Sequence, residues 1–276
     1  MKMKESELKA MISLLDDDEL TIQIEEKIMS LGTEIIPTLE SVWESNFDAK
    51  LQERIEDITH RLQFQLLKER LIDWKEESSD DLLKGMWIIA TYLYPDLELE
   101  KLRQEFEQLY YEAWLEFKPD MLPLDQVRVL NGVLFSKLKY KPNTKNFHSP
   151  SNSMINNVME SKRGNPIALC VVYLLVSQKL KLPIYGVNLP NMFILTYKSP
   201  EQQFYINAFN RGLIFSKEDI DNYINHLELT PRSIFFDPCT NEEIITRVLR
   251  NLIVSFEKLN EHYKADEVKV LLKVME

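Results

Sequence analysis

The feature that most constrains the fold is a mostly apolar stretch in the second half of the chain. Residues 166–180 read Pro-Ile-Ala-Leu-Cys-Val-Val-Tyr-Leu-Leu-Val-Ser-Gln-Lys-Leu. A helix with apolar side chains around nearly its whole circumference must be covered on all sides, so the stretch predicts a helix in the protein interior. Pro166 fits its first turn, because the N–H that proline lacks would have no intrahelical partner there. The unbroken apolar part ends at Val176, about half the length of a membrane span, so no membrane association is expected.

The chain before this stretch carries helical periodicity. Apolar residues recur at helical spacing, and glycine and proline interrupt the pattern at Gly32 and Pro95. One hairpin resembles a HEAT repeat, but a single copy favours ordinary helical packing. Ser78 and Asp81 have the spacing of a capping box. The predicted helices cover residues 8–15, 22–31, 35–43, 49–75, 82–94, 97–117 and 123–138.

The chain after Tyr140 changes in character. Residues 141–165 are rich in Asn, Ser, Pro and Lys and are expected to form loops. After the apolar stretch, short β-branched and aromatic segments predict strands over 184–189, 192–197 and 203–209, with a turn at Gly212. Two further capping boxes, Ser216 with Asp219 and Thr240 with Glu243, predict helices that end near His226 and Phe256. A last helix is expected over 265–275.

These segments predict a predominantly helical α+β fold. Its order is an N-terminal helical array, a central buried helix with a small antiparallel sheet, and a C-terminal helix pair. The predicted division is residues 1–140, 141–230 and 231–276.

Charge and residue usage exclude several classes of protein. The net charge is -11, whereas a protein that binds the nucleic-acid backbone needs a basic surface, so no direct contact with nucleic acid is expected. The two cysteines and four histidines form no zinc-binding pattern, and neither a metal nor a cofactor is predicted. Two isolated cysteines and the lack of a signal-peptide pattern favour a cytoplasmic location.

Four segments in the central region carry a family resemblance. They are Asn-Phe-His-Ser-Pro-Ser-Asn-Ser (146–153), Lys-Arg-Gly-Asn-Pro-Ile (162–167), Leu-Pro-Ile-Tyr-Gly-Val-Asn-Leu-Pro (182–190) and Phe-Tyr-Ile-Asn-Ala-Phe-Asn-Arg-Gly (204–212). In this order, over about 70 residues, they resemble the bacterial SirB branch of the transglutaminase-like superfamily, which has a papain-type core. The segment Arg247-Val-Leu-Arg-Asn-Leu-Ile is similar to the tetratricopeptide-like helices that follow this core.

The resemblance implies a degenerate active site. Active members of the superfamily place a cysteine at the start of the buried helix, a histidine on the next strands and an aspartate on the following strand. The matching positions here hold Pro166, Met192 and Asn207. We expect these three side chains to meet in space and to support no cysteine chemistry.

Other residues offer alternative chemistry. Cys170 lies one turn deeper in the apolar helix and is expected to act as a small buried hydrophobe. Cys239 precedes a predicted helix, where a thiol pKa can fall, but no histidine is near it in sequence. His148 lies in the Asn/Ser-rich loop and either faces the cleft or only satisfies backbone groups.

Three functional hypotheses follow. The favoured one is a non-catalytic binding or scaffold module for an unidentified protein or peptide partner. Its vestigial cleft would be lined by Asn165, Pro166, Asn191, Met192, Asn207, Asn210, Arg211 and His148. The second is a hydrolase or acyl-transferase that uses Cys170 or Cys239. The third, a regulator that contacts nucleic acid, conflicts with the acidic charge.

Overall fold

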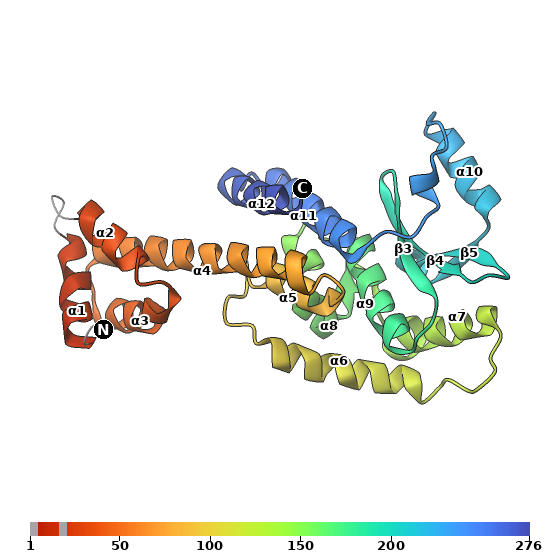
Figure 1. Cartoon of the computed structure of the whole chain (residues 1–276), viewed down its shortest axis with the longest axis horizontal. Helices are drawn as coiled ribbons and strands as arrows, with labels where there is room; N and C mark the ends of the chain where they lie inside the picture. Colours follow the sequence, from red (N-terminus) through yellow and green to blue (C-terminus); the bar gives the residue numbers. More distant parts are fainter. Residues whose placement is uncertain (1–4, 17–20) are drawn as a thin grey trace. The chain divides into compact units, whose positions relative to one another are not determined.

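The computed structural model describes residues 5–16 and 21–276, and the chain divides into two compact units, Met1–Arg70 and Leu71–Glu276. The fold is predominantly helical α+β, as predicted (Figure 1). Within the described residues, no helix combines the length and apolar character needed to cross a membrane. The finer division predicted at residues 140 and 230 stays a prediction.

The first unit is a small helical cluster. It contains α1 (Glu5–Ser13), α2 (Thr21–Met29), α3 (Ile36–Ser45) and the first part of α4 (Ala49–Glu77). Their apolar stripes meet in a core that includes the buried side chains of Ile12, Ile28 and Leu39. Gly32 follows α2 with a φ of 72°, a conformation that glycine adopts without strain.

The second unit is built around α9 (Pro166–Lys179). Every residue from Ile167 to Ser177 is buried, which confirms the predicted interior helix. Helices α6, α8 and α11 and strands β3 and β4 all contact α9. The helices of this unit, besides α9 and the end of α4, are α5 (Leu82–Ala90), α6 (Leu99–Trp114), α7 (Pro123–Asn131), α8 (Ile155–Ser161), α10 (Lys217–His226), α11 (Asn241–Lys258) and α12 (His262–Met275), and a π-helical segment, Gly132–Lys137, continues α7.

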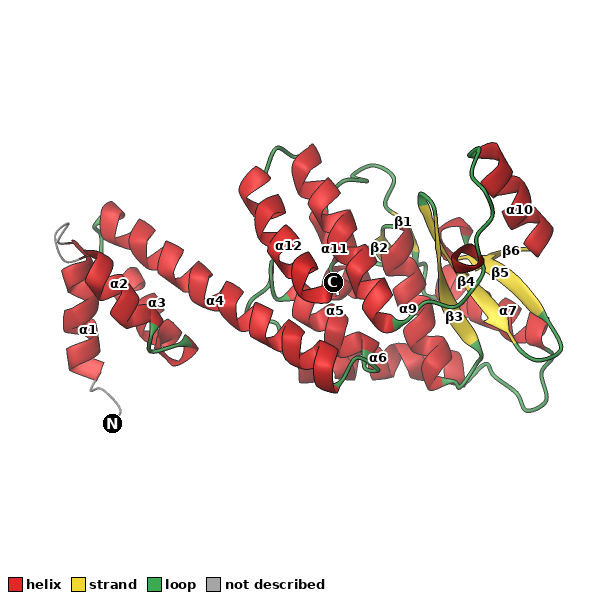
Figure 2. Ribbon diagram, turned by 45° about the horizontal axis from the view of Figure 1, so that its top comes forward, coloured by secondary structure: helices red, strands yellow, loops and turns green. Residues whose placement is uncertain are grey.

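The sheet is antiparallel, with the strand order β3-β4-β5-β6. Its strands are β3 (Ile184–Leu189), β4 (Met192–Lys198), β5 (Gln203–Asn207) and β6 (Leu213–Phe215). Figure 2 shows the sheet between α9 and α10. On the α10 side, Val187, Ile194 and Tyr205 form a buried cluster with Ile220 and Ile224 of that helix. Because successive side chains of a strand alternate between faces, the α9 side of β4 carries Phe193 and Leu195.

Two local predictions were wrong. Residues 141–165 are not all loop, since they contain α8 and a parallel pairing of β1 (Lys141–Pro142) with β2 (Arg163–Gly164). The two-turn α8 buries Ile155, Val158 and Met159, but its asparagines have low helix propensity and hid the pattern. The cap of α5 is the Asp81 side chain, which accepts from the Lys84 N–H, rather than a box opened by Ser78.

Candidate functional site

A pocket of about 170 Å³ lies where α9 begins. Four segments line it: the loop before residue 150, the first residues of α9, the turn between β3 and β4, and α11. Its walls include the apolar side chains of Phe147, Phe193 and Val254. Its polar lining residues are His148, Asn165, Asn191, Arg247, Asn251 and Ser255.

The start of α9 is held by the buried side chain of Asn165. Its Oδ1 accepts from the Ala168 N–H at 2.9 Å, which caps the helix. Its Nδ2 donates to the Ser153 hydroxyl at 2.7 Å. Pro166 follows in the first turn and also lines the pocket. The amide of Asn165 is therefore engaged in positioning the helix, and the ring of Pro166 lies beside it at the edge of the pocket.

The hairpin between β3 and β4 presents Asn191 to this pocket. Asn191 has a φ of 59° and stands in a tight turn closed by the pairing of Leu189 with Met192. Met192 itself packs against the cluster on the α10 side of the sheet. Since Phe193 lines the pocket and neighbouring side chains point to opposite faces, the structure does not bring Met192 to Pro166.

The remaining predicted cleft residues lie in the turn between β5 and β6. Asn207 Oδ1 accepts from the Asn210 N–H at 3.1 Å and caps a short 3-10 turn. Asn210 and Arg211 are exposed, and neither of them nor Asn207 lines the pocket. The structure thus gathers His148, Asn165, Pro166 and Asn191 of the eight predicted residues. Their role in binding stays a prediction.

Arg247 is a pocket residue that the predicted set omits. Its guanidinium is partly buried and donates to Asn188 Oδ1 at 2.9 Å. Burial is the main cause that lowers the pKa of Arg247, with the neighbouring charge of Arg250 adding to it. Among the described residues, no carboxylate forms an ion pair with Arg247. The sequence shows that Arg247, Asn251 and Val254 share one face of a helix. It does not show which pocket that face lines.

Neither thiol lies in this pocket. Cys170 is fully buried, its Sγ is 3.6 Å from the Phe193 carbonyl oxygen, and burial raises its pKa. Cys239 lines a separate pocket of about 320 Å³ beside Tyr185 and Gly186, and burial raises its pKa to about 12.

The pocket at α9 shows no acid–base constellation. Its lining among the described residues contains no thiol and no carboxylate. The same part of the chain contains no group of three His, Cys, Asp or Glu side chains arranged to hold a metal ion. The arrangement is therefore a small, partly cationic recess with amide and aromatic walls.

Comparison with known proteins agrees with this core. Residues 100–250 match the transglutaminase-like superfamily (Transglut_core2). A UPF0162 protein of Xylella fastidiosa is 29% identical over 188 residues, which are 62% of this chain and 63% of that protein. The UPF0162 protein YchA of Escherichia coli K12 is 24% identical over 185 residues, which are 65% of this chain and 68% of that protein.

A shorter likeness covers less than a third of the chain. The mouse F-box only protein 21 is 30% identical over 91 residues, which are 30% of this chain and 14% of that protein. No solved structure matches. The superfamily match covers more than half of the chain and includes the buried helix and the sheet, so the chain belongs to the transglutaminase-like superfamily.

Proposed function

We propose that this protein is a non-catalytic binding module of the transglutaminase-like superfamily, whose pocket at the start of α9 seats an acidic group of a peptide or protein segment. The observation that carries the proposal is the pairing of two features in one pocket. Pro166 occupies the first turn of α9, and the partly buried cation of Arg247 lines the same recess with no carboxylate partner in the described part of the chain.

The first feature argues against covalent catalysis. A cysteine at the start of a helix is activated because the helix dipole favours the thiolate. Proline has no such group, and Cys170 lies a full turn further along α9 with its pKa raised by burial. Cys239 lines a different pocket, and burial raises its pKa as well. Both sulfurs therefore favour the protonated, weakly nucleophilic form at neutral pH.

The second feature indicates what the pocket recognises. The Arg247 guanidinium is partly withdrawn from water, and its side-chain hydrogen bond among residues 5–16 and 21–276 goes to the neutral amide of Asn188, so its charge is incompletely compensated. A carboxylate supplies the missing charge and matches the planar geometry of the arginine side chain. Asn251 and Asn191 supply amides for the flanking backbone.

The size of the pocket limits the occupant. A volume of about 170 Å³ is below the range of roughly 300–1,000 Å³ that whole small molecules occupy. It suits one side chain or one chain terminus, with the rest of the segment lying outside. The occupant we propose is therefore the C-terminal carboxylate or a single acidic side chain of a peptide.

A peptide-binding assay tests this proposal. Fluorescence polarisation would measure binding of a random peptide library with free C-termini, sorted into acidic and non-acidic pools, beside the same pools with amidated C-termini. We expect selected acidic or free-carboxylate peptides to bind, and Arg247→Met to weaken them by at least about tenfold. Arg250→Met removes an exposed arginine three residues away on the same helix and should leave binding unchanged.

Two results would contradict the proposal. One is equal binding by wild type and the Arg247→Met variant, and the other is equal loss in both arginine variants. Conversion of a peptide into a hydrolysed or acylated product by the wild-type chain would instead support the cysteine-dependent alternative.

A further inference from the structure

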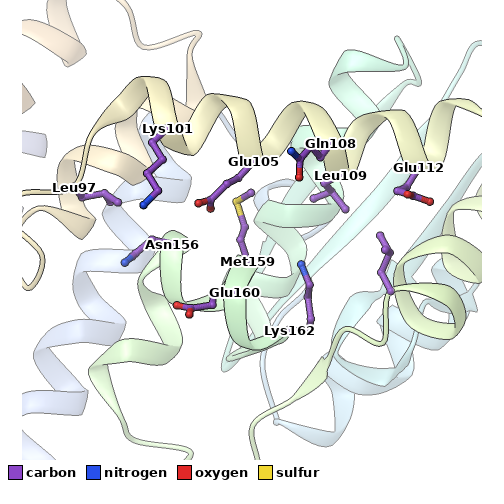
Figure 3. A pocket seen from close by; sticks show the side chains of 11 residues that line it. Leu97, Lys101, Glu105, Gln108, Leu109, Glu112, Asn156, Met159, Glu160 and Lys162 are labelled. Carbon is purple, nitrogen blue, oxygen red and sulfur yellow. The ribbon is translucent and has the colours of Figure 1, made fainter.

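A second and larger cavity lies apart from the pocket at α9. It is a groove of about 570 Å³ between α6 and α8, within the size range of small-molecule sites. Leu109 and Met159 provide a buried apolar floor. Figure 3 shows Lys101 and Asn156 towards one end of the groove, Glu105 and Met159 in its middle, and Lys162 beside Gln108 and Leu109.

Lys162 brings a partly desolvated cation to this groove. It directly follows α8 with a φ of 57° and is half-buried. Its ammonium donates to the Tyr140 hydroxyl at 3.3 Å and lies 4.9 Å from the centre of the same ring. Among the described residues no carboxylate pairs with it, and burial lowers its pKa. A phenol and a ring face compensate an ammonium only in part.

Glu105 faces this cation without touching it. The charge of Glu105 acts on the pKa of both Lys162 and Tyr140, so the carboxylate lies within electrostatic reach of both. In the part of the chain that the structure describes, however, Glu105 forms no ion pair. The groove therefore places Lys162 and Glu105 near each other without an ion pair between them, and Lys101 and Glu160 also line it.

A third polar group of the groove is a side-chain amide. The Oδ1 atom of Asn156 is buried and accepts no hydrogen bond from the described residues. A buried acceptor left unpaired costs free energy, which a donor on a bound molecule would recover. Glu112, at the far end, is already paired with Lys137 at 3.0 Å.

We propose that the groove between α6 and α8 binds a small zwitterion with an apolar body, of the class of free α-amino acids or dipeptides. Its carboxylate contacts Lys162, its ammonium contacts Glu105, and its apolar part packs on Leu109 and Met159. A simple anion would satisfy Lys162 but would be repelled by Glu105, and a simple cation would meet the reverse problem. The zwitterion is the ligand class that compensates both Lys162 and Glu105, and Lys101 and Glu160 add one further charge of each sign to the same groove.

Isothermal titration calorimetry and methyl NMR of the full-length chain test the proposal. The probes are L-leucine, L-methionine, L-phenylalanine and the dipeptide Leu-Leu. N-acetyl-L-leucine lacks the ammonium and L-leucinamide lacks the carboxylate. We expect at least one zwitterion to bind and to shift the Met159 methyl signal. That signal is identified by its disappearance from the spectrum of the Met159→Leu variant. Each blocked compound should bind at least about tenfold more weakly.

Matched variants locate the site. Lys162→Met and Glu105→Gln should each weaken the bound zwitterion by at least about tenfold. Lys181→Met is the control for the first, because Lys181 also follows a helix with a φ of 58° but does not line the groove. Glu100→Gln is the control for the second, since Glu100 is on α6 but outside the groove.

Several results would overturn the proposal. The first is that none of the four zwitterions shifts the Met159 methyl signal at millimolar concentration. The second is that a blocked compound binds as tightly as its zwitterion. The third is that binding is unchanged in both the Lys162→Met and the Glu105→Gln variants. Binding of free amino acids but not Leu-Leu, or the reverse, identifies which source the groove accepts. Arg247→Met should leave this binding intact, so the outcome is independent of the peptide pocket.

Discussion

At the scale of single residues, partly buried cations mark both proposed sites. Arg247 and Lys162 are each withdrawn from water, and neither has a carboxylate partner among the described residues. Such groups cost folding free energy, and stability alone would favour an apolar side chain of similar size. Their contacts, a neutral amide for Arg247 and a tyrosine for Lys162, leave room for a ligand anion.

The two thiols are expected to be unreactive in the folded protein. Burial raises the pKa of Cys239 to about 12 and raises that of Cys170 further, so at neutral pH both stay protonated. Alkylation by iodoacetamide at pH 7.5 should be slow in buffer and fast in denaturant, where the pKa returns to about 8.5. Mass spectrometry of each cysteine peptide would measure both rates. Fast labelling of either cysteine in the native state would contradict the non-catalytic proposal.

The raised pKa values of the two thiols also make the stability of the fold depend on pH. Because the pKa of each thiol is higher in the folded state, the unfolded chain loses its protons first as the pH rises. This contribution to stability is complete below about pH 8.5 and declines above it. Replacing Cys239 with Ser should make the loss of unfolding free energy above about pH 8.5 smaller. Urea titrations repeated between pH 7 and pH 10 would measure that free energy.

Gly212 is a position where a side chain cannot fit. Its φ is 76°, and a Cβ atom there would come within 2.0 Å of Asn131 Oδ1. Asn131 Nδ2 also donates to the Gly212 carbonyl at 2.8 Å, so moving the asparagine breaks this bond. Gly212→Ala should lower the free energy of unfolding by about 2–3 kcal/mol. In urea denaturation, Gly132→Ala is the control, because open space surrounds that glycine and its change should stay within about 1 kcal/mol.

At the scale of elements, α9 organises the pocket that it lines through its first turn. Asn165 caps the helix and also bonds Ser153, so it joins α9 to the preceding loop. The residue was predicted as a cleft contact, and the structure adds a structural role to it. That role makes Asn165 unsuitable as a probe of binding, because we expect its loss to disturb the start of α9, including Pro166.

Two substitutions separate the contributions of the two hydrogen bonds of Asn165 to stability. Asn165→Ala removes the helix cap and the bond to Ser153 and should cost about 2 kcal/mol of unfolding free energy. Ser153→Ala removes only the second bond and should cost about half as much. Chemical denaturation followed by circular dichroism would measure both. Equal costs for the two variants would contradict the assigned capping role.

At the scale of the whole molecule, the chain divides after Arg70. The second unit contains all the residues of the pocket at α9 and of the groove between α6 and α8. It also contains α5 and α6, which pack against α8, and α6 against α9. The helices predicted as a separate N-terminal region thus include elements that cover the core.

Two fragments test where the core begins. Residues 71–276 should fold cooperatively, because they keep the helices that cover α8 and α9. Residues 141–276 should not, since without α5 and α6 the apolar surface of α8 and α9 is exposed. Thermal unfolding followed by circular dichroism would compare them. A cooperative transition in the shorter fragment would favour the boundary predicted at residue 140.

The sequence by itself determined the elements whose signals are short-range. The burial of α9 follows from apolar residues on every side of one helix. The boxes at Ser216 and Thr240 form as expected, because a cap depends on residues only three positions apart. Strands β3, β4 and β5 begin where predicted, since turn residues bound each of them.

Only the tertiary structure decided which side chains share a site. A step of one residue along β4 moves a side chain to the opposite face, so Phe193 lines the same pocket as Pro166, whereas Met192 packs on the α10 side. Arg247 reaches the same pocket from a helix 81 residues after Pro166, a distance over which no local pattern acts. The groove needs α6 to pack beside α8, a helix that the asparagine-rich sequence concealed. Local propensity selects helices and strands, but long-range packing alone brings their side chains into one cavity.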